Sequence, residues 1–194
     1  MTVDFILLLC AAYLLGSISF AVLLARLRHQ PDPRSFGSGN PGASNMLRLG
    51  NRPLALATLL GDMGKGALVV WLAARVGLEP VQQAWVGLLA LLGHILPLYY
   101  RFQGGKGVAT AAGVLLILSW PAAALAALVW LGVFALRATA SLASLAACVA
   151  ILPWTAWHTP DLQIPVSLMV LVILLRHRLN IGRLLAGTEN RFRH

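Results

Sequence analysis

A glycine-rich stretch at residues 37–45 is dense in hydrogen-bond donors. Its glycines are Gly37, Gly39 and Gly42, its polar side chains are Ser38, Asn40, Ser44 and Asn45, and Arg48 follows it. The three glycines let the backbone take conformations closed to other residues, so that successive amides turn toward one point and form a nest for an anion. The polar side chains add neutral donors, and Arg48 adds a charged one. The stretch predicts a phosphate site, although the same composition also makes ordinary turns.

An acid and a base lie three residues apart in the apolar run that follows, in Gly61-Asp62-Met63-Gly64-Lys65-Gly66. Ionised side chains inside a membrane span are costly, and they occur mainly as pairs or at functional sites. On a helix Asp62 and Lys65 share one face, where they can neutralise each other. We expect either this structural pair or contact between Lys65 and a phosphate group.

A second glycine-rich turn lies between two later apolar runs. Gly93, His94 and Pro97 close the first run, and Gly104, Gly105, Lys106 and Gly107 open the next. A glycine-rich turn at a helix start favours an anion, because free amides and the helix dipole both attract negative charge. The spacing does not fit a Walker loop. We expect Lys106 to lie over an anion site, and His94 to be either a proton carrier or a structural residue.

Basic and polar residues crowd the segment after the last apolar run. They are Arg176, His177, Arg178, Asn180 and Arg183, with Gly187 and Glu189 beyond them. Such a segment can be a simple anchor for anionic lipid head groups. Helical spacing, however, puts Arg176, Asn180 and Arg183 on one face, with His177 beside Arg176. This order favours a site role for His177 and Asn180.

The composition places the chain in a membrane. Of its 194 residues 59% are hydrophobic and 11% are charged, whereas about a quarter of the residues in soluble domains are charged. The apolar residues form unbroken runs, not the alternating pattern of a β-barrel, so the expected fold class is all-α. Nothing between the runs is long enough for a separate soluble domain, and we expect residues 1–194 to form one domain.

Metal chemistry has no support in the sequence. No Cys/His spacing resembles a zinc site, the six acidic residues are scattered, and both Cys10 and Cys148 lie inside apolar runs. We expect no metal, no other cofactor and no nucleic-acid partner. The sequence carries no signal for an oligomeric state.

Seven apolar runs predict a bundle of about seven transmembrane helices, near residues 3–25, 53–74, 81–100, 107–119, 121–136, 138–157 and 164–175. Lys and Arg are retained on the cytoplasmic side, and they are most frequent at residues 26–52 and 176–193, the latter including Arg193. This pattern predicts an outside amino terminus and a cytosolic carboxyl terminus. All four polar stretches then face the cytosol, where we expect them to form one site for a phosphorylated ligand.

These motifs, in this order, resemble those of the PlsY family, the bacterial acyl-phosphate-dependent glycerol-3-phosphate acyltransferases. Residues 37–45 are similar to the family's first motif, with Ser44 where a Thr is common, and residues 62–66, 93–110 and 176–189 are similar to the others. The resemblance covers nearly the whole chain and implies a multi-pass protein of the bacterial inner membrane. It also implies transfer of an acyl group from acyl phosphate to the 1-hydroxyl of glycerol 3-phosphate, which yields lysophosphatidate and inorganic phosphate.

The site predicted on this basis has two groups of residues. The candidate catalytic residues are Ser38, Lys106, His177 and Asn180. The candidate substrate-binding residues are Gly37, Gly39, Asn40, Gly42, Asn45, Arg48, Lys65, His94, Gly104, Gly105 and Gly107. The proton acceptor is open between His94, His177 and a bound phosphate.

The expected partners are the two substrates and membrane lipids. A transporter of a phosphorylated metabolite is the alternative function, because it would also place basic residues and glycine-broken helices around an anion. A transporter of this kind usually repeats its motifs in two halves, and the Asn40 and Asn180 motifs have no convincing second copy.

Overall fold

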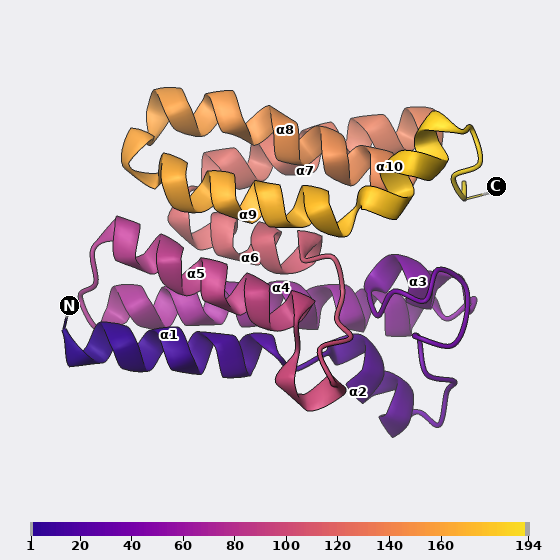
Figure 1. Ribbon diagram of the computed structural model, residues 1–194, viewed down its shortest axis with the longest axis horizontal. Helices are drawn as coiled ribbons and strands as arrows, with labels where there is room; N and C mark the ends of the chain where they lie inside the picture. The colour runs from indigo at the N-terminus through magenta and orange to yellow at the C-terminus, as the bar shows by residue number, and fades with distance from the viewer. Residues whose placement is uncertain (1, 193–194) are drawn as a thin grey trace. The chain divides into compact units, whose positions relative to one another are not determined.

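The structure is a computed structural model that describes residues 2–192 and divides into two compact units (Figure 1). Unit 1 ends at Leu118, and unit 2 begins at Ser119. All regular structure within the described residues is helical, as the apolar runs predict. The single domain stays a prediction, and Arg193, one of the predicted cytosolic residues, lies outside the described residues.

Each unit is a small helical bundle. Unit 1 contains α1 (Val3–Gly16), α2 (Phe20–Leu27), α3 (Ala43–Leu47), α4 (Arg52–Arg75), α5 (Pro80–Ile95), the short η1 (Leu98–Tyr100) and α6 (Val108–Leu118). Unit 2 contains α7 (Trp120–Arg137), α8 (Ala140–His158), the short η2 (Pro160–Leu162), α9 (Gln163–Arg176) and α10 (Arg178–Leu185). In unit 1, α4 packs against α5 and α6, α1 packs against α5, and α2 and α3 pack against α4. In unit 2, α8 packs against both α7 and α9.

Every predicted apolar run forms a helix or a bent pair of helices. Four segments are long and apolar enough to cross a membrane: Arg52–Arg75, Pro80–Tyr100, Trp120–Arg137 and Ala140–His158. Two pairs, α1 with α2 and η2–α9 with α10, are bent by 46° and 60° and qualify as a broken span or a re-entrant loop. The 11 residues of α6 extend about 16 Å, roughly half of a bilayer core of about 30 Å. The all-α membrane bundle is confirmed, whereas its orientation and a full crossing by α6 stay predictions.

Local capping fixes where the two central helices of unit 1 begin. At the start of α4, Asn51 Oδ1 accepts a hydrogen bond from the Leu54 amide at 3.0 Å. At the start of α5, Gln82 Oε1 accepts one from the Glu79 amide at 3.0 Å, and Pro80 occupies the first helical position. Both arrangements satisfy amides that a helix start leaves without a partner.

Glycines bring the helices of unit 1 into backbone contact. A Cβ at Gly66 of α4 would collide with the Thr110 carbonyl of α6, and a Cβ at Gly113 would collide with the backbone of α4. Gly16 of α1 is pressed in the same way against the Ala90 carbonyl of α5. Small residues at helix crossings are a main source of helix association in membranes, where lipid removes most of the hydrophobic driving force. One glycine of the polar stretch 61–66 therefore serves packing.

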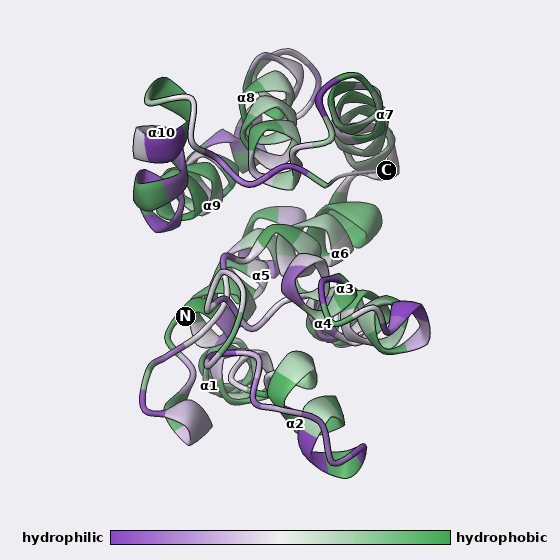
Figure 2. Ribbon diagram, turned by 90° about the vertical axis from the view of Figure 1, so that its right-hand side faces the viewer, coloured by the Kyte–Doolittle hydropathy of each residue, from purple (hydrophilic) through white to green (hydrophobic). Residues whose placement is uncertain are grey.

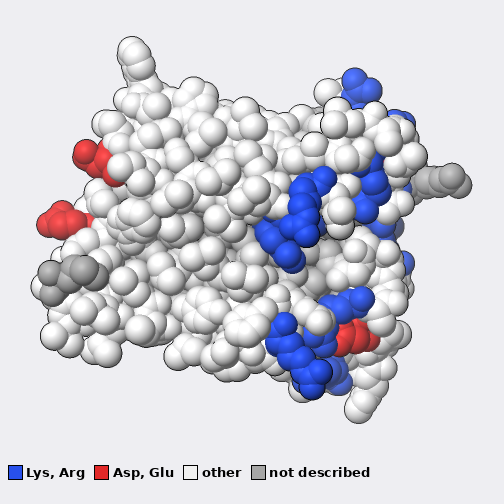
Figure 3. All heavy atoms as spheres, viewed as in Figure 1, with Lys and Arg blue, Asp and Glu red and all other residues white. Residues whose placement is uncertain are grey.

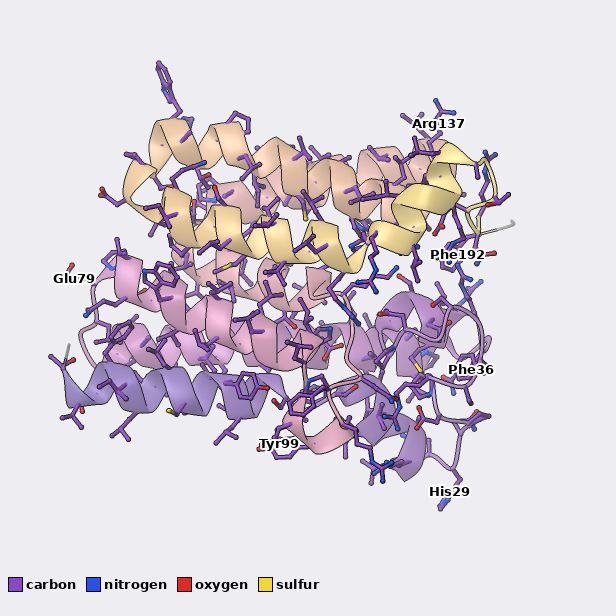
Figure 4. The ribbon with its side chains drawn as sticks, viewed as in Figure 1. His29, Phe36, Glu79, Tyr99, Arg137 and Phe192 are labelled. Carbon is purple, nitrogen blue, oxygen red and sulfur yellow. The ribbon has the colours of Figure 1, made fainter. Side chains whose placement is uncertain are left out.

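Polar residues concentrate at one end of unit 1. Figure 4 places Glu79 at one end of this unit and His29 and Phe36 at the other, with Tyr99 between them. On the face shown in Figure 3, the Lys and Arg side chains of unit 1 gather at the second end, over α2 and the segments beside it. Figure 2 shows hydrophobic colouring along the helices and hydrophilic colouring at the outer end of α2 and in the connections. The glycine-rich stretches lie at this polar end.

Substitution of the glycine at the α4–α6 contact tests this packing. Gly66→Ala is expected to lower the free energy of unfolding by about 1–3 kcal/mol, because the new methyl group meets backbone that has no room to move. Gly64→Ala is the matched control, since Gly64 lies in the same helix and faces open space. This control should be neutral or stabilising by up to about 1 kcal/mol. Thermal unfolding of the two variants is followed by circular dichroism in the same detergent. Equal unfolding midpoints for Gly66→Ala and Gly64→Ala would contradict a tight α4–α6 contact.

Candidate active site

Asn45 organises the first glycine-rich stretch from inside. Its side chain is buried, and its Oδ1 accepts a hydrogen bond from the Ser38 amide at 2.9 Å. Its Nδ2 donates to the carbonyl oxygens of Pro33 at 2.8 Å and Phe36 at 3.2 Å. The carboxamide is thus engaged by the loop that it shapes, and contact of Asn45 with substrate stays a prediction.

The glycines of this stretch have different tasks. Gly37 and Gly39 have φ of +57° and +67°, the left-handed region that favours glycine, which confirms the predicted turn. Gly42 has an extended φ of −154° immediately before α3, so the prediction that all three glycines need special conformations is wrong for Gly42. A Cβ there would lie 2.9 Å from Asn40 Nδ2, and the absence of a side chain makes room for Asn40.

The side chains around this turn face solvent more than Asn45 does. Ser38 and Arg48 are exposed, and Asn40 is half-buried. A Cβ at Gly37 would lie 3.6 Å from Arg48 Cδ, so the stem of Arg48 runs beside the turn. A buried apolar cluster holds α2, α3 and α4 together beneath it: Ala21, Ala25, Met46, Leu54 and Ala55. The turn therefore presents Ser38 and Arg48 on a fixed base.

Arg34 ties this stretch to the connection between α5 and α6. Its guanidinium pairs with the Asp32 carboxylate at 2.6 Å, donates to the Tyr100 carbonyl at 3.5 Å and lies 5.8 Å from the centre of the Tyr100 ring. The hydrogen bond between them lowers the pKa of Asp32 and raises the pKa of Arg34. The pair stays ionised at neutral pH and holds the two glycine-rich segments at the same end of unit 1.

Lys65 lies in a buried polar cluster. Its Nζ is 3.1 Å from Asp62 Oδ1, which confirms the predicted pair. The ammonium also donates to the carbonyl oxygens of Gly16 at 2.9 Å and Ile18 at 2.6 Å, at the end of α1, and lies 2.9 Å from His94 Nδ1. An ammonium has three N–H donors, and these contacts engage all of them. The geometry gives Lys65 a structural role, and its contact with phosphate stays a prediction.

His94 separates this cluster from the second glycine-rich turn. The Gly105 amide donates to the His94 carbonyl at 3.1 Å, a Cβ at Gly105 would collide with His94 Nε2, and a Cβ at Gly104 would collide with the His94 carbonyl. Gly107 has φ of +88°, and the half-exposed Lys106 lies just before α6. The predicted helix start behind the turn is confirmed. His94 makes structural contacts here, and its role as a proton carrier stays a prediction.

In unit 2 several polar side chains meet on Glu189. Its Oε1 accepts hydrogen bonds from Ser141 Oγ at 2.8 Å and Asn180 Nδ2 at 2.6 Å, and its Oε2 pairs with Arg183 Nε at 2.8 Å. Burial raises the pKa of Glu189, but the hydrogen bonds from Arg183, Asn180 and Ser141 outweigh it, so the pKa lies below its usual value. The carboxylate fixes the orientation of the Asn180 carboxamide.

His177 lies at the bend between α9 and α10. Its Nδ1 is 2.9 Å from the Ile173 carbonyl, which can only accept, so Nδ1 donates and Nε2 is the accepting nitrogen of the neutral ring. The 60° bend separates Arg176 from the helix that follows. The prediction that Arg176, Asn180 and Arg183 share one helical face is therefore wrong for Arg176. Asn180 and Arg183 do share one, because both reach the same carboxylate.

Three of the four predicted stretches are connected within unit 1. Arg34 links the first stretch to the α5–α6 connection, and Lys65 links the second stretch to His94 and the turn beside it. The fourth stretch lies in unit 2, and its meeting with the others stays a prediction. The polar end of unit 1 combines hydroxyl and basic side chains, which suit a phosphate ligand.

Comparison with known proteins identifies the family. The family model for glycerol-3-phosphate acyltransferase matches residues 6–187. The glycerol-3-phosphate acyltransferase of Pseudomonas entomophila is 57% identical over 181 residues, which cover 93% of this chain and 96% of that protein. The enzyme of that name from Pseudomonas syringae pv. tomato is 57% identical over 97% of this chain and 98% of its own. This chain belongs to the glycerol-3-phosphate acyltransferase family.

Two crystal structures of one family member have the same fold. They are structures of PlsY (YgiH), an integral membrane glycerol 3-phosphate acyltransferase. Its glycerol 3-phosphate form matches with a TM-score of 0.92 and 36% identity over 98% of this chain and 96% of that chain. Its lysophosphatidic acid form matches with a TM-score of 0.90 and 35% identity over the same shares. The PlsY resemblance predicted from the motifs is confirmed.

Three residues that organise these polar segments are absent from the predicted site residues. Glu189 is the only acid after Asp161, and an isolated acid in a basic tail is a usable signal for an ion pair. Arg34 two residues after Asp32 is a weaker signal of the same kind. Ser141 carries no signal, because a serine in an apolar helix is ordinary.

The Glu189 carboxylate is expected to make the stability of unit 2 depend on pH. Its folded-state pKa is lowered, so its contribution is present above the unfolded value of about 4.3 and is lost as the pH falls through the folded-state pKa. Glu189→Gln should lower the free energy of unfolding at pH 7 by about 2 kcal/mol.

Unfolding midpoints measured from about pH 7 to pH 3 check this prediction. The acid-induced loss should be smaller in Glu189→Gln than in the unsubstituted protein. Asp161→Asn changes an exposed acid of the same unit and serves as the control. Identical pH profiles for Glu189→Gln and the unsubstituted protein would contradict the role of the carboxylate.

Proposed function

We propose that this protein transfers a fatty acyl group from acyl phosphate to the 1-hydroxyl of glycerol 3-phosphate, which gives lysophosphatidate and inorganic phosphate. The proposal is carried by the match of 98% of the chain to PlsY in its glycerol 3-phosphate form and its lysophosphatidic acid form. The second ligand is the first with an acyl group on one hydroxyl, so the two are acceptor and product of one acyl transfer. Membership of an acyltransferase family favours this function over transport of a phosphorylated metabolite.

The polar end of unit 1 supplies donors for phosphate groups. Ser38, Asn40 and Arg48 surround the turn at Gly37 and Gly39 and offer side-chain donors, while the Ser38 and Gly39 amides donate within the turn itself. Lys106 adds a second cation at the start of α6, where the helix dipole also attracts an anion. These groups bind the phosphates of the two substrates, and the surplus of positive charge favours dianionic ligands over neutral ones.

The reaction requires positioning more than chemical activation. The 1-hydroxyl oxygen attacks the acyl carbon, the bond from that carbon to the phosphate oxygen breaks, and the phosphate leaves with the electron pair. Asn180 stabilises the glycerol phosphate or the oxygen that becomes negative in the transition state. The hydroxyl proton passes to His177 Nε2 or to a phosphate oxygen. His177 is preferred to His94, because the Lys65 ammonium donates to His94 Nδ1 and leaves the ring proton on Nε2, whereas His177 carries its proton on Nδ1 and donates it to Ile173.

The site faces the cytosol of the inner membrane in this proposal. The distribution of Lys and Arg supports that orientation, and a cytosolic site gives direct access to a soluble phosphorylated acceptor. The acyl chain lies against lipid or between helices, where each buried methylene contributes about 0.8 kcal/mol to binding.

An assay with purified protein tests the proposal. Palmitoyl phosphate and glycerol 3-phosphate should yield lysophosphatidate and inorganic phosphate in equal amounts. Lys106→Ala should lower kcat/KM by about 100-fold or more, since one cation at a reacting phosphate contributes about 3 kcal/mol. Arg75→Ala, which changes a cation beside Trp71 near the Glu79 end of unit 1, is the control and should leave kcat/KM unchanged.

Two results would overturn the proposal. One is folded protein that forms no product while its proteoliposomes exchange glycerol 3-phosphate, which would favour the transporter. The other is full activity in Lys106→Ala, which would remove Lys106 from the site.

A further inference from the structure

The buried Asp62–Lys65–His94 cluster takes no part in the reaction proposed above. The Asp62 and Lys65 side chains are 3% and 4% exposed, and His94 Nδ1 lies 2.9 Å from the Lys65 ammonium and 3.5 Å from the Asp62 carboxylate. Removing two charges from water costs several kcal/mol, and apolar residues often replace such a pair without loss of stability. Stability alone therefore does not account for the cluster, and its position indicates its role.

The cluster joins four segments of unit 1 at one point. Asp62 and Lys65 belong to α4 and His94 belongs to α5. The ammonium donates to the carbonyl oxygens of Gly16 and Ile18, which lie where α1 ends and the chain bends toward α2. The fourth segment is the turn at residues 104–107, which lies directly on His94.

The turn contacts both the backbone carbonyl and the imidazole ring of His94. The Gly105 amide donates to the His94 carbonyl at 3.1 Å, and neither Gly104 nor Gly105 has room for a Cβ against this residue. Because the ammonium donates to Nδ1, the neutral ring carries its proton on Nε2, the nitrogen beside Gly105. Lys65 thus fixes the tautomer and the plane of the ring on which the turn lies.

We propose that the Asp62–Lys65–His94 cluster is a positioning device for the turn that carries Lys106. The link to catalysis rests on the phosphate-binding role proposed for Lys106, whereas the positioning itself does not. The charge pair holds His94 in one orientation, His94 holds Gly104 and Gly105, and the next residue is placed at the start of α6. A displacement of about 1 Å at a substrate-positioning group is enough to cost roughly 100-fold in rate.

His94→Asn separates positioning from simple charge pairing. The Asn side chain can place an oxygen where His94 Nδ1 lies, so that Lys65 keeps its acceptor, but it removes the ring edge under Gly105. The expected result is about 10-fold faster hydrogen exchange of the amides at residues 104–107, with a thermal midpoint close to that of the unsubstituted protein. His158→Asn makes the same change at the exposed end of α8 and should leave this exchange unchanged.

The kinetic expectation is a change in KM more than in kcat. A loosened turn weakens phosphate binding in ground state and transition state alike, so the KM of a phosphorylated substrate should rise about 10-fold while kcat changes less. A merely structural role would lower the amount of active protein and leave KM unchanged. His94→Gln, which can place a polar atom near the Nε2 position, should restore part of the loss.

The exchange measurement decides the proposal. Unchanged exchange at 104–107 in folded His94→Asn overturns it. Faster exchange with unchanged KM supports the positioning device and instead contradicts the phosphate role of Lys106. If His94→Asn does not fold, Asp62→Glu applies the same test, because it keeps the charge but shifts Lys65 relative to His94. Faster exchange in Asp62→Glu supports the proposal, and unchanged exchange overturns it.

Discussion

A charged ammonium inside an apolar helical bundle must be surrounded by acceptors, and this constraint organises unit 1. Lys65 meets it with a carboxylate of α4, an imidazole of α5, and two backbone carbonyls at the end of α1 and in the bend that follows. The carbonyls are accessible because α1 ends at Gly16, and a bend of 46° follows before α2 continues. Carbonyl oxygens left without helical partners at such a break would be unfavourable in lipid. Here a protein side chain donates to them, as irregular backbone at membrane depth requires.

Glycines make the rest of this arrangement possible in three distinct ways. At Gly37 and Gly39 the backbone is left-handed and closes a turn around the Asn45 carboxamide. At Gly66 and Gly113 the missing side chain lets α4 and α6 touch. At Gly105 it lets a loop lie against an imidazole ring. Helices held this closely leave little freedom to the polar end of the unit, which is the requirement for binding two anions in reacting positions.

The helical spans were predictable because a bilayer demands long apolar runs with internal hydrogen bonds, and the sequence contains such runs. The bend at His177 was not predictable, since no proline or glycine marks it, and the face shared by Arg176 and Asn180 was inferred wrongly for that reason.

The Asp62–Lys65 pair was predictable because its two members are close in sequence. The contact of Ser141 with Glu189 spans 48 residues and depends on tertiary packing. The separate tasks of the glycines were also hidden, because one residue type serves all of them.

The central proposal is that the two glycine-rich segments at the polar end of unit 1 bind the phosphate groups of the substrates. Hydrogen exchange of the detergent-solubilised protein, measured with and without saturating glycerol 3-phosphate, tests it directly. The account predicts that amides at residues 37–40 and 104–107 exchange at least about 5-fold more slowly with ligand, while those of the α4–α5 connection do not change. If both segments exchange at the same rate with and without glycerol 3-phosphate, in protein that forms lysophosphatidate, that result would contradict the account.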